Sequence, residues 1–262
     1  PATGNHWLLT DLLRKQWHYQ GFVVSDWNAV QELKAHGVAE TDEDAALLAL
    51  KAGVDMNMTD GLYNRCLVTA VREKHLSVSD IDTAVERILR AKYALGLFDD
   101  PYRFLDVTRE RREVRSSRLD SLARKAAALS MVLLKNKAAV LPLPKQIRCI
   151  ALVGPLANNQ DEVMGSWNAR GNARDVVTVK EGLRQKLGNE VVIDYIQGCD
   201  FTDPSKREFS AAFDAAQQSD VVIAVLGEKA LMSGESRSRA MLRLPGQQEA
   251  LLDTLHKAGK PL

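Results

Sequence analysis

The segment from Gly21 to Trp27 carries the first group that could do chemistry. A short apolar run ends in a carboxylate, Asp26, and a large aromatic side chain, Trp27, follows at once. A run of this length between turn-like flanks predicts a buried parallel strand. In a barrel of parallel strands, residues at the carboxyl end of a strand face the active site. The pattern therefore predicts a rigidly held carboxylate at the mouth of a pocket, with a flat apolar surface beside it.

A second carboxylate is needed if that chemistry is the hydrolysis of a glycosidic bond, because one carboxyl group acts as nucleophile or base and the other as acid. The segment from Val225 to Arg239 carries Glu228 and Glu235 beside small residues and two arginines. It leaves a predicted strand at its carboxyl end, which is the usual ligand side of an open α/β sheet. Composition alone leaves both glutamates as ordinary loop charges.

The elements that would position Asp26 alternate between helices and strands. An apolar stripe predicts a helix at 6–17, and a capping-box start predicts a second helix at 41–53. An alternating apolar run predicts a strand at 54–58. With the Asp26 strand they form a parallel strand–helix–strand unit. A loop or short helix is predicted at 27–37, and further helices at 62–74, 79–96 and 119–129.

A second alternation follows residue 145. Strands are predicted at 147–153, 191–196 and 221–226, and helices at 176–187, 209–217 and 245–257. This order predicts a second α/β domain with a mostly parallel sheet. We therefore expect an α/β chain with a first domain at 1–106, a linker and helix at 107–144, and a second domain at 145–262.

Composition and charge argue against several function classes. The 262 residues carry a net charge of +1, which implies no strong attraction to nucleic acid or to an anionic membrane. The arginine-rich stretch 109–118 lacks interleaved aromatic residues, so it predicts a solvated linker or helix surface. No apolar run approaches the roughly 20 residues that span a bilayer. The three cysteines match no zinc spacing, and Gly154-Pro155 does not form a phosphate-binding glycine motif. We expect no metal and no cofactor.

Several motifs, in order, resemble glycoside hydrolase family 3, with its periplasmic β-glucosidase subgroup the most similar. The Asp26 segment resembles the nucleophile strand of that family. The other matching segments are Pro1-Ala2-Thr3-Gly4-Asn5, Ala52-Gly53-Val54-Asp55-Met56-Asn57-Met58, Leu133-Leu134-Lys135-Asn136, Gly154-Pro155-Leu156-Ala157, Met164-Gly165-Ser166-Trp167, Val225-Leu226-Gly227-Glu228 and Leu244-Pro245-Gly246-Gln247.

The resemblance implies a retaining exo-β-glucosidase with a (β/α)₈-type barrel followed by an α/β sandwich domain. Asp26 would be the nucleophile and Glu235 the acid/base. Trp27 and Ser166 would contact the sugar. Met58, which alternates with Met56 on a predicted strand, is by default a core residue, and its place near the strand end makes it a candidate to line the sugar site. Two reserve acid/base candidates are Glu32, six residues after Asp26, and Glu228. The two arginines that follow Glu235 would favour its ionised form unless their side chains point away.

The resemblance also implies that the chain holds only the last part of the barrel and an incomplete sandwich, so we expect the fragment alone to be inactive or unstable. The alternatives are a β-xylosidase, a β-N-acetylglucosaminidase or a non-catalytic sugar-binding relic. The expected partners are a β-glucoside or oligosaccharide substrate and, for self-assembly, a homodimer, with no nucleic acid and no membrane. A periplasmic or secreted location follows from the family alone.

Overall fold

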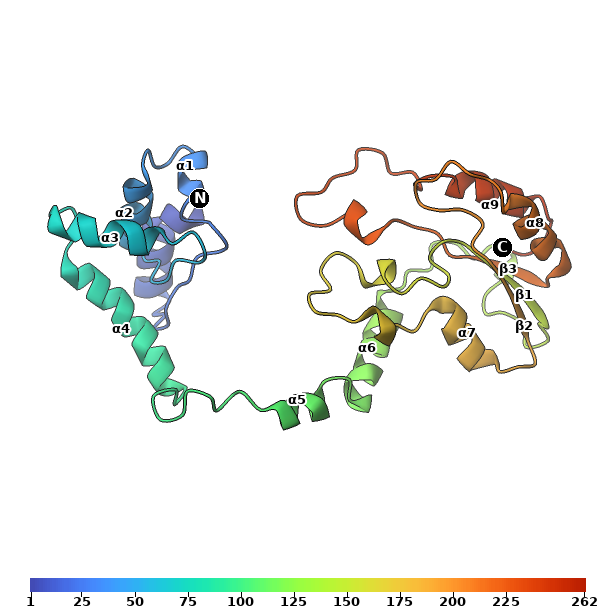
Figure 1. Cartoon of the computed structure of the whole chain (residues 1–262), viewed down its shortest axis with the longest axis horizontal. Helices are drawn as coiled ribbons and strands as arrows, with labels where there is room; N and C mark the ends of the chain where they lie inside the picture. Colours follow the sequence, from blue (N-terminus) through green and yellow to red (C-terminus); the bar gives the residue numbers. More distant parts are fainter. The chain divides into compact units, whose positions relative to one another are not determined.

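The computed structural model describes all residues from 1 to 262 and divides into two compact units, Pro1–Ser130 and Met131–Leu262 (Figure 1). Each unit is described by itself. The division falls within the stretch 107–144, for which the sequence predicts a linker and a helix. None of the helices is long and apolar enough to cross a bilayer.

The first unit is built from helices. They are η1 (Ala2–Gly4), the π-helix η2 (Trp7–Gln16), α1 (Glu32–Ala35), α2 (Asp42–Ala52), α3 (Leu62–Arg72), α4 (Val78–Ala94), α5 (Val107–Glu113) and α6 (Ser117–Ser130). Its core lies where α2 and α3 pack together, and α5 and α6 bury no residue. The largest fully buried side chains of this core are Val30, Leu33, Val54 and Leu62.

Caps fix the ends of two of these helices. Thr41 and Asp44 form the predicted capping box of α2, and their hydrogen bonds lower the pKa of the Asp44 carboxyl. Gly53 ends α2 with a left-handed φ of 117°, which a residue without Cβ adopts at no steric cost. The predicted cap of α4 at 79–82 lies two residues too late, because Ser77 is the N-cap and its Oγ accepts from the N–H of Ser79.

The two strands predicted on either side of α2 are reduced to a single parallel bridge, between Val24 and Met56. The prediction of two regular strands is therefore wrong, although their direction is parallel as expected. Val23 explains the difference. Its N–H donates to Asp55 Oδ2 at 2.7 Å, while its carbonyl accepts from the N–H groups of both Asp55 and Met56, at 2.8 and 3.0 Å. The Asp55 side chain thus takes the N–H of Val23 that would otherwise bond to the backbone of the neighbouring strand, and the regular pairing stops there.

The second unit is an α/β structure with a three-stranded parallel sheet. Its strands are β1 (Cys149–Val153), β2 (Val192–Ile196) and β3 (Val221–Ala224), in the order β2-β1-β3. Its helices are α7 (Val179–Leu187), α8 (Phe209–Gln218) and α9 (Gln248–His256), with short 3-10 turns η3 (Lys137–Ala139), η4 (Glu162–Met164), η5 (Ala173–Asp175) and η6 (Ala230–Met232). The predicted parallel sheet and its helices are confirmed.

The sheet is covered on both faces (Figure 1). Ala151 and Val153 of β1 pack against α8 and α9, and Leu152, which points the other way, packs against Leu183 of α7. The central strand is therefore apolar on both sides, as expected for a buried parallel strand.

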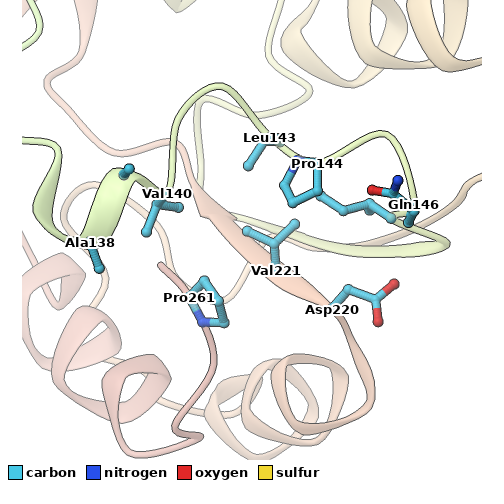
Figure 2. A pocket seen from close by; sticks show the side chains of 10 residues that line it. Ala138, Val140, Leu143, Pro144, Gln146, Asp220, Val221 and Pro261 are labelled. Atoms are coloured by element: carbon cyan, nitrogen blue, oxygen red, sulfur yellow. The ribbon is translucent and has the colours of Figure 1, made fainter.

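A cavity of about 490 Å³ in the second unit lies at the amino ends of β1 and β3 (Figure 2). Its lining is largely apolar, with Leu143, Val221 and Pro261 around it. Asp220 at its rim accepts hydrogen bonds from the N–H groups of Arg148 and Cys149, which lower the pKa of its carboxyl. Ligands of open α/β sheets bind at the opposite, carboxyl ends of the strands, so this cavity is not the candidate site.

Candidate active site

The backbone that carries Asp26 is fixed by its buried neighbour, Ser25. The Ser25 N–H donates to the carbonyl of Met56 at 2.9 Å. The Ser25 hydroxyl donates to the carbonyl of Asp26 and accepts from the N–H of Met58, both at 2.9 Å. One buried serine therefore joins the Asp26 segment to the segment that contains Met58.

Asp26 is itself exposed, and its Oδ1 accepts from the N–H of Trp27 at 2.7 Å. Trp27 is 65% exposed and Met58 38% exposed, and the N–H of Asn28 donates to the Met58 carbonyl. The structure therefore brings the Met58 backbone beside the segment of Asp26 and Trp27, and the side chains of all three residues are exposed. Glu32, the first reserve candidate, begins α1 and is exposed.

Beneath this segment lies a buried ion cluster centred on Asp55. Its carboxylate accepts from Arg14 at 2.5 Å, from Arg87 at 2.8 Å and from the N–H of Val23 at 2.7 Å. Arg14 also donates to the carbonyls of Gly21 and Gly53. The side chains of Asp55 and Arg14 are only 2% and 10% exposed, so the charges are held away from water. Both segments that meet beside Asp26 are thus anchored to one carboxylate.

In the second unit, Glu235 lies on the long loop between β3 and α9, residues 225–247, which we call the Glu235 loop. The preceding residue, Gly234, has a left-handed φ of 121°, and a Cβ at this position would lie 2.4 Å from the Ser166 hydroxyl. The loop and Ser166 are therefore in close contact. The structure brings together two residues that the sequence assigns to the sugar site, Glu235 and Ser166.

A second contact joins the same two segments. The N–H of Ala230 donates to Glu162 Oε2 at 2.7 Å. Glu162 lies in η4, four residues before Ser166, so the η4 segment and the Glu235 loop are tied at two points. Glu228, the other reserve candidate, pairs with Arg239 at 2.9 Å. Its carboxylate is therefore already engaged by a cation.

Two family models match the chain. The model of the Glycosyl hydrolase family 3 N terminal domain matches residues 1–91, and that of the Glycosyl hydrolase family 3 C-terminal domain matches residues 131–262. The chain belongs to glycosyl hydrolase family 3. Asp26 lies within the region matched by the N-terminal domain model, and Glu235 within the region matched by the C-terminal domain model.

Individual family 3 proteins match over the whole chain. A relative from Salmonella typhimurium named "Periplasmic beta-glucosidase" is 40% identical over 100% of this chain and 37% of its own length. A "Beta-xylosidase" from Formosa agariphila is 37% identical over 100% of this chain and 38% of its length. The crystal structure of a β-glucosidase from Listeria innocua in complex with isofagomine gives a TM-score of 0.90 at 38% identity, covering 100% of this chain and 36% of that one. The chain thus spans little more than a third of the length of these relatives.

The residues that support the Asp26 segment and the Glu235 loop were mostly missed by sequence reasoning. Asp55 sits in an apolar strand pattern, Val54-Asp55-Met56, and an acidic group in such a place needs a partner. That signal could have indicated a buried ion cluster. No comparable pattern marks Glu162 or Arg239, since both are charged residues in exposed segments.

One group of possible metal ligands includes neither Asp26 nor Glu235. Glu43, Glu73 and His75 place ligand atoms within 4.8 Å of one another, with His75 Nδ1 2.9 Å from Glu43 Oε1. The hydrogen bond to Glu43 raises the pKa of His75. A protonated imidazole paired with a carboxylate accounts for this group without a metal.

Proposed function

We propose that the whole protein is a retaining, exo-acting β-glucosidase that hydrolyses terminal non-reducing β-D-glucosyl residues. The observation that carries the proposal is the placement of Asp26, an exposed carboxylate on a backbone anchored by Ser25, with Trp27 beside it. The identity to the Salmonella relative, 40% over the whole chain, supports glucose as the sugar.

The proposal includes the finer fold. The first unit would form the last part of a (β/α)₈-type barrel and the second unit part of an α/β sandwich domain. The chain spans 37% of the length of the Salmonella relative, so the tests below use the full-length enzyme. A periplasmic or secreted location, which the name of the Salmonella relative supports, and a homodimer belong to the same proposal.

The proposed chemistry has two steps. Asp26 attacks the anomeric carbon while Glu235 gives its proton to the leaving oxygen, so that the glycosidic bond breaks and a covalent glycosyl-Asp26 ester forms. Glu235, now a carboxylate, takes a proton from water as the water oxygen attacks the anomeric carbon. The ester bond breaks, Asp26 leaves as a carboxylate and the sugar is released with its configuration retained.

The other site residues have supporting roles in this proposal. The exposed ring of Trp27 offers a flat surface on which a sugar ring stacks, and Met58 adds apolar contact beside it. The Ser166 hydroxyl, which lies against Gly234, would reach a sugar hydroxyl next to Glu235. Glu32 and Glu228 remain reserves for the acid/base role.

A β-xylosidase is the second candidate, because a relative of that name from Formosa agariphila is 37% identical over the whole chain. A solved family 3 exo-β-xylosidase in complex with a xylobiose aziridine probe, at 30% identity and a TM-score of 0.85, points the same way. Glucose and xylose differ by one hydroxymethyl group, so kcat/KM on the two aryl glycosides decides between them.

The test uses the full-length enzyme and p-nitrophenyl β-D-glucoside. We expect Asp26→Asn to lower kcat/KM by roughly four orders of magnitude or more, the scale at which loss of a nucleophile acts. Glu235→Gln should lower it by roughly 10²–10⁴-fold, the contribution of a general acid. Glu40→Gln is the matched control, an exposed glutamate of the first unit, and should leave kcat/KM unchanged.

Two further measurements decide the mechanism. A 2-deoxy-2-fluoroglucoside with a good leaving group should label the peptide that contains Asp26, and proton NMR should show the β-anomer released first. Release of the α-anomer first, or a label on another peptide, would contradict the proposed roles. Glu32→Gln shows whether this reserve residue, and not Glu235, is the acid/base.

A further inference from the structure

The Glu235 loop needs side-chain bonds to hold a single conformation. It runs for 23 residues, 225–247, between β3 and α9, and its one regular element is the 3-10 turn η6. Loops of this length are uncommon, and ordering them costs conformational entropy for every residue. The bonds that the structure shows across this loop therefore indicate what keeps Glu235 in place.

The base of the loop is closed by Gln248, whose side chain is fully buried. Its Oε1 accepts from the N–H of Gly227 at 2.8 Å. Its Nε2 donates to the carbonyls of Gly227 and Pro245, at 2.7 and 3.0 Å. One amide thus joins the start of the loop to its end, but it leaves the stretch between them untied.

Arg239 ties that stretch. Its Nη1 lies 2.9 Å from Glu228 Oε1, on the outgoing arm of the loop. Its Nη2 donates to the carbonyls of Arg243 at 2.9 Å and Met241 at 3.3 Å, on the returning arm. Its side chain is 24% exposed. A planar guanidinium with several donors suits a site that must hold a carboxylate and two carbonyls together.

We propose that the Glu228–Arg239 pair is a clasp that holds the Glu235 loop in the conformation that presents Glu235 to the substrate. Arg239 is then a positioning residue, and Glu228 is its anchor. The inference rests on the proposed function, because that function gives Glu235 its acid/base role. Glu235 lies between the two ends of the clasp, seven residues after Glu228 and four before Arg239.

The clasp also answers an electrostatic difficulty. An arginine close to an acid/base glutamate would form an ion pair with it and hold it as a carboxylate. Here the guanidinium of Arg239 is already paired with Glu228 and bonded to two carbonyls. Glu228 therefore has a role of its own, which is to compensate the charge of Arg239.

The first test does not depend on activity. Trypsin cuts after arginine, and Arg237 lies in the exposed part of the loop, so the rate of cleavage after Arg237 reports loop opening. We expect Arg239→Ala to raise that rate about tenfold in the full-length enzyme. Arg239→Lys should lie in between, because one ammonium cannot span all three acceptors.

The matched control is Arg243→Ala. Arg243 also pairs with a glutamate, Glu249, but that pair lies outside the stretch that the clasp closes. Its carbonyl, which accepts from Arg239, is kept in the variant. The rate of cleavage after Arg237 should stay within about twofold of the wild type.

The second test separates positioning from a general loss of structure. A general acid matters for a poor leaving group and hardly for one that departs as a stable anion. We expect Arg239→Ala to lower kcat/KM about 100-fold on methyl β-D-glucoside and by less than about threefold on 2,4-dinitrophenyl β-D-glucoside. Arg243→Ala should leave both values near those of the wild type.

Each outcome decides one of the two ideas. If the wild type hydrolyses no β-glycoside, the proposed function is wrong, and the trypsin assay still decides whether the clasp exists. Equal cleavage rates in Arg239→Ala and Arg243→Ala would overturn the clasp. Equal losses on the two glucosides, in a variant that opens as expected, would show that Arg239 does not position the acid.

Discussion

The two carboxylates proposed for one reaction are held in different ways. Asp26 follows a short segment whose backbone is bonded to Ser25 and to the buried cluster of Asp55, Arg14 and Arg87. Glu235 sits on a long exposed loop, where an ion pair within the loop and a hydrogen bond to Glu162 of η4 replace regular structure. Asp26 is therefore held by buried residues that bond to its segment, and Glu235 by an ion pair and hydrogen bonds made elsewhere on its loop.

A functional side chain can be held in place either by buried supporting residues or by bonds to neighbouring exposed segments. The two arrangements have different consequences for stability. Breaking a buried ion pair leaves an uncompensated charge away from water, which is strongly destabilising. Breaking an exposed pair costs about 0–1 kcal/mol. We therefore expect changes around Asp26 to affect folding and activity together, and changes around Glu235 to affect mainly activity.

The largest expected effect is that of Asp55→Ala. The change leaves Arg14 and Arg87 without their shared carboxylate and Val23 without its acceptor, so we expect the free energy of unfolding of the first unit to fall by about 3–5 kcal/mol. Hydrogen exchange of the α2 amides in increasing urea measures that unit alone.

Asp82→Ala is the control for this prediction, since Asp82 is an exposed aspartate of the same unit. Its effect should stay within about 0.5 kcal/mol. A loss of less than about 1 kcal/mol for Asp55→Ala would remove the contrast between the supports of Asp26 and those of Glu235, because the buried cluster would then contribute no more than the partly exposed pair of Glu228 and Arg239.

The sequence predicts the sheet of the second unit well and the Asp26 segment only in part. Apolar runs such as Ile150-Ala151-Leu152 are buried on both faces of the sheet, so their local pattern and their final environment agree. The Asp26 segment has the same apolar pattern. The structure nevertheless gives it a bridge and no ladder, because the carboxylate of Asp55 takes the N–H of Val23.

The sequence offers the candidate residues, but it does not indicate the contacts that support the Glu235 loop. Asp26 stands at the end of an apolar run, and family resemblance places Glu235. Glu162, Arg239 and Gln248 support the loop through contacts that depend on how distant segments approach, and periodicity carries no information on such contacts.

An intermediate effect is expected for Gly234→Ala, which tests the contact between the Glu235 loop and Ser166. The added Cβ would lie 2.4 Å from Ser166 Oγ, at a φ of 121° that a side chain rarely adopts, a strain of about 1–3 kcal/mol. Because the loop is exposed, we expect it to move and not to unfold the unit. On methyl β-D-glucoside, kcat/KM should fall about tenfold, with little change in unfolding free energy.

Gly188→Ala separates the clash from the backbone strain. Gly188 also has a left-handed φ, of 68°, but nothing lies within 4 Å of its added Cβ. This variant should lose some stability and keep its kcat/KM. If Gly234→Ala instead destabilised the unit as much as Gly188→Ala and kept full activity, the contact with Ser166 would have no part in placing Glu235.

The smallest effect is expected for the exposed pair of His75 and Glu43 in the first unit. No candidate site residue depends on this pair, so its effect is on stability alone. The hydrogen bond from Glu43 raises the pKa of His75 above 6.5 in the folded state, so the protonated form favours folding. That contribution is fully present below about pH 6.5 and is lost as the pH rises through the raised pKa.

The urea midpoint of α2 exchange should therefore fall with rising pH more in the wild type than in His75→Gln. His36→Gln, an exposed histidine of the same unit, should follow the wild type. A wild-type midpoint that rose with pH relative to His75→Gln would mean that the neutral imidazole is the favoured form, and the ion pair with Glu43 would then not exist in solution.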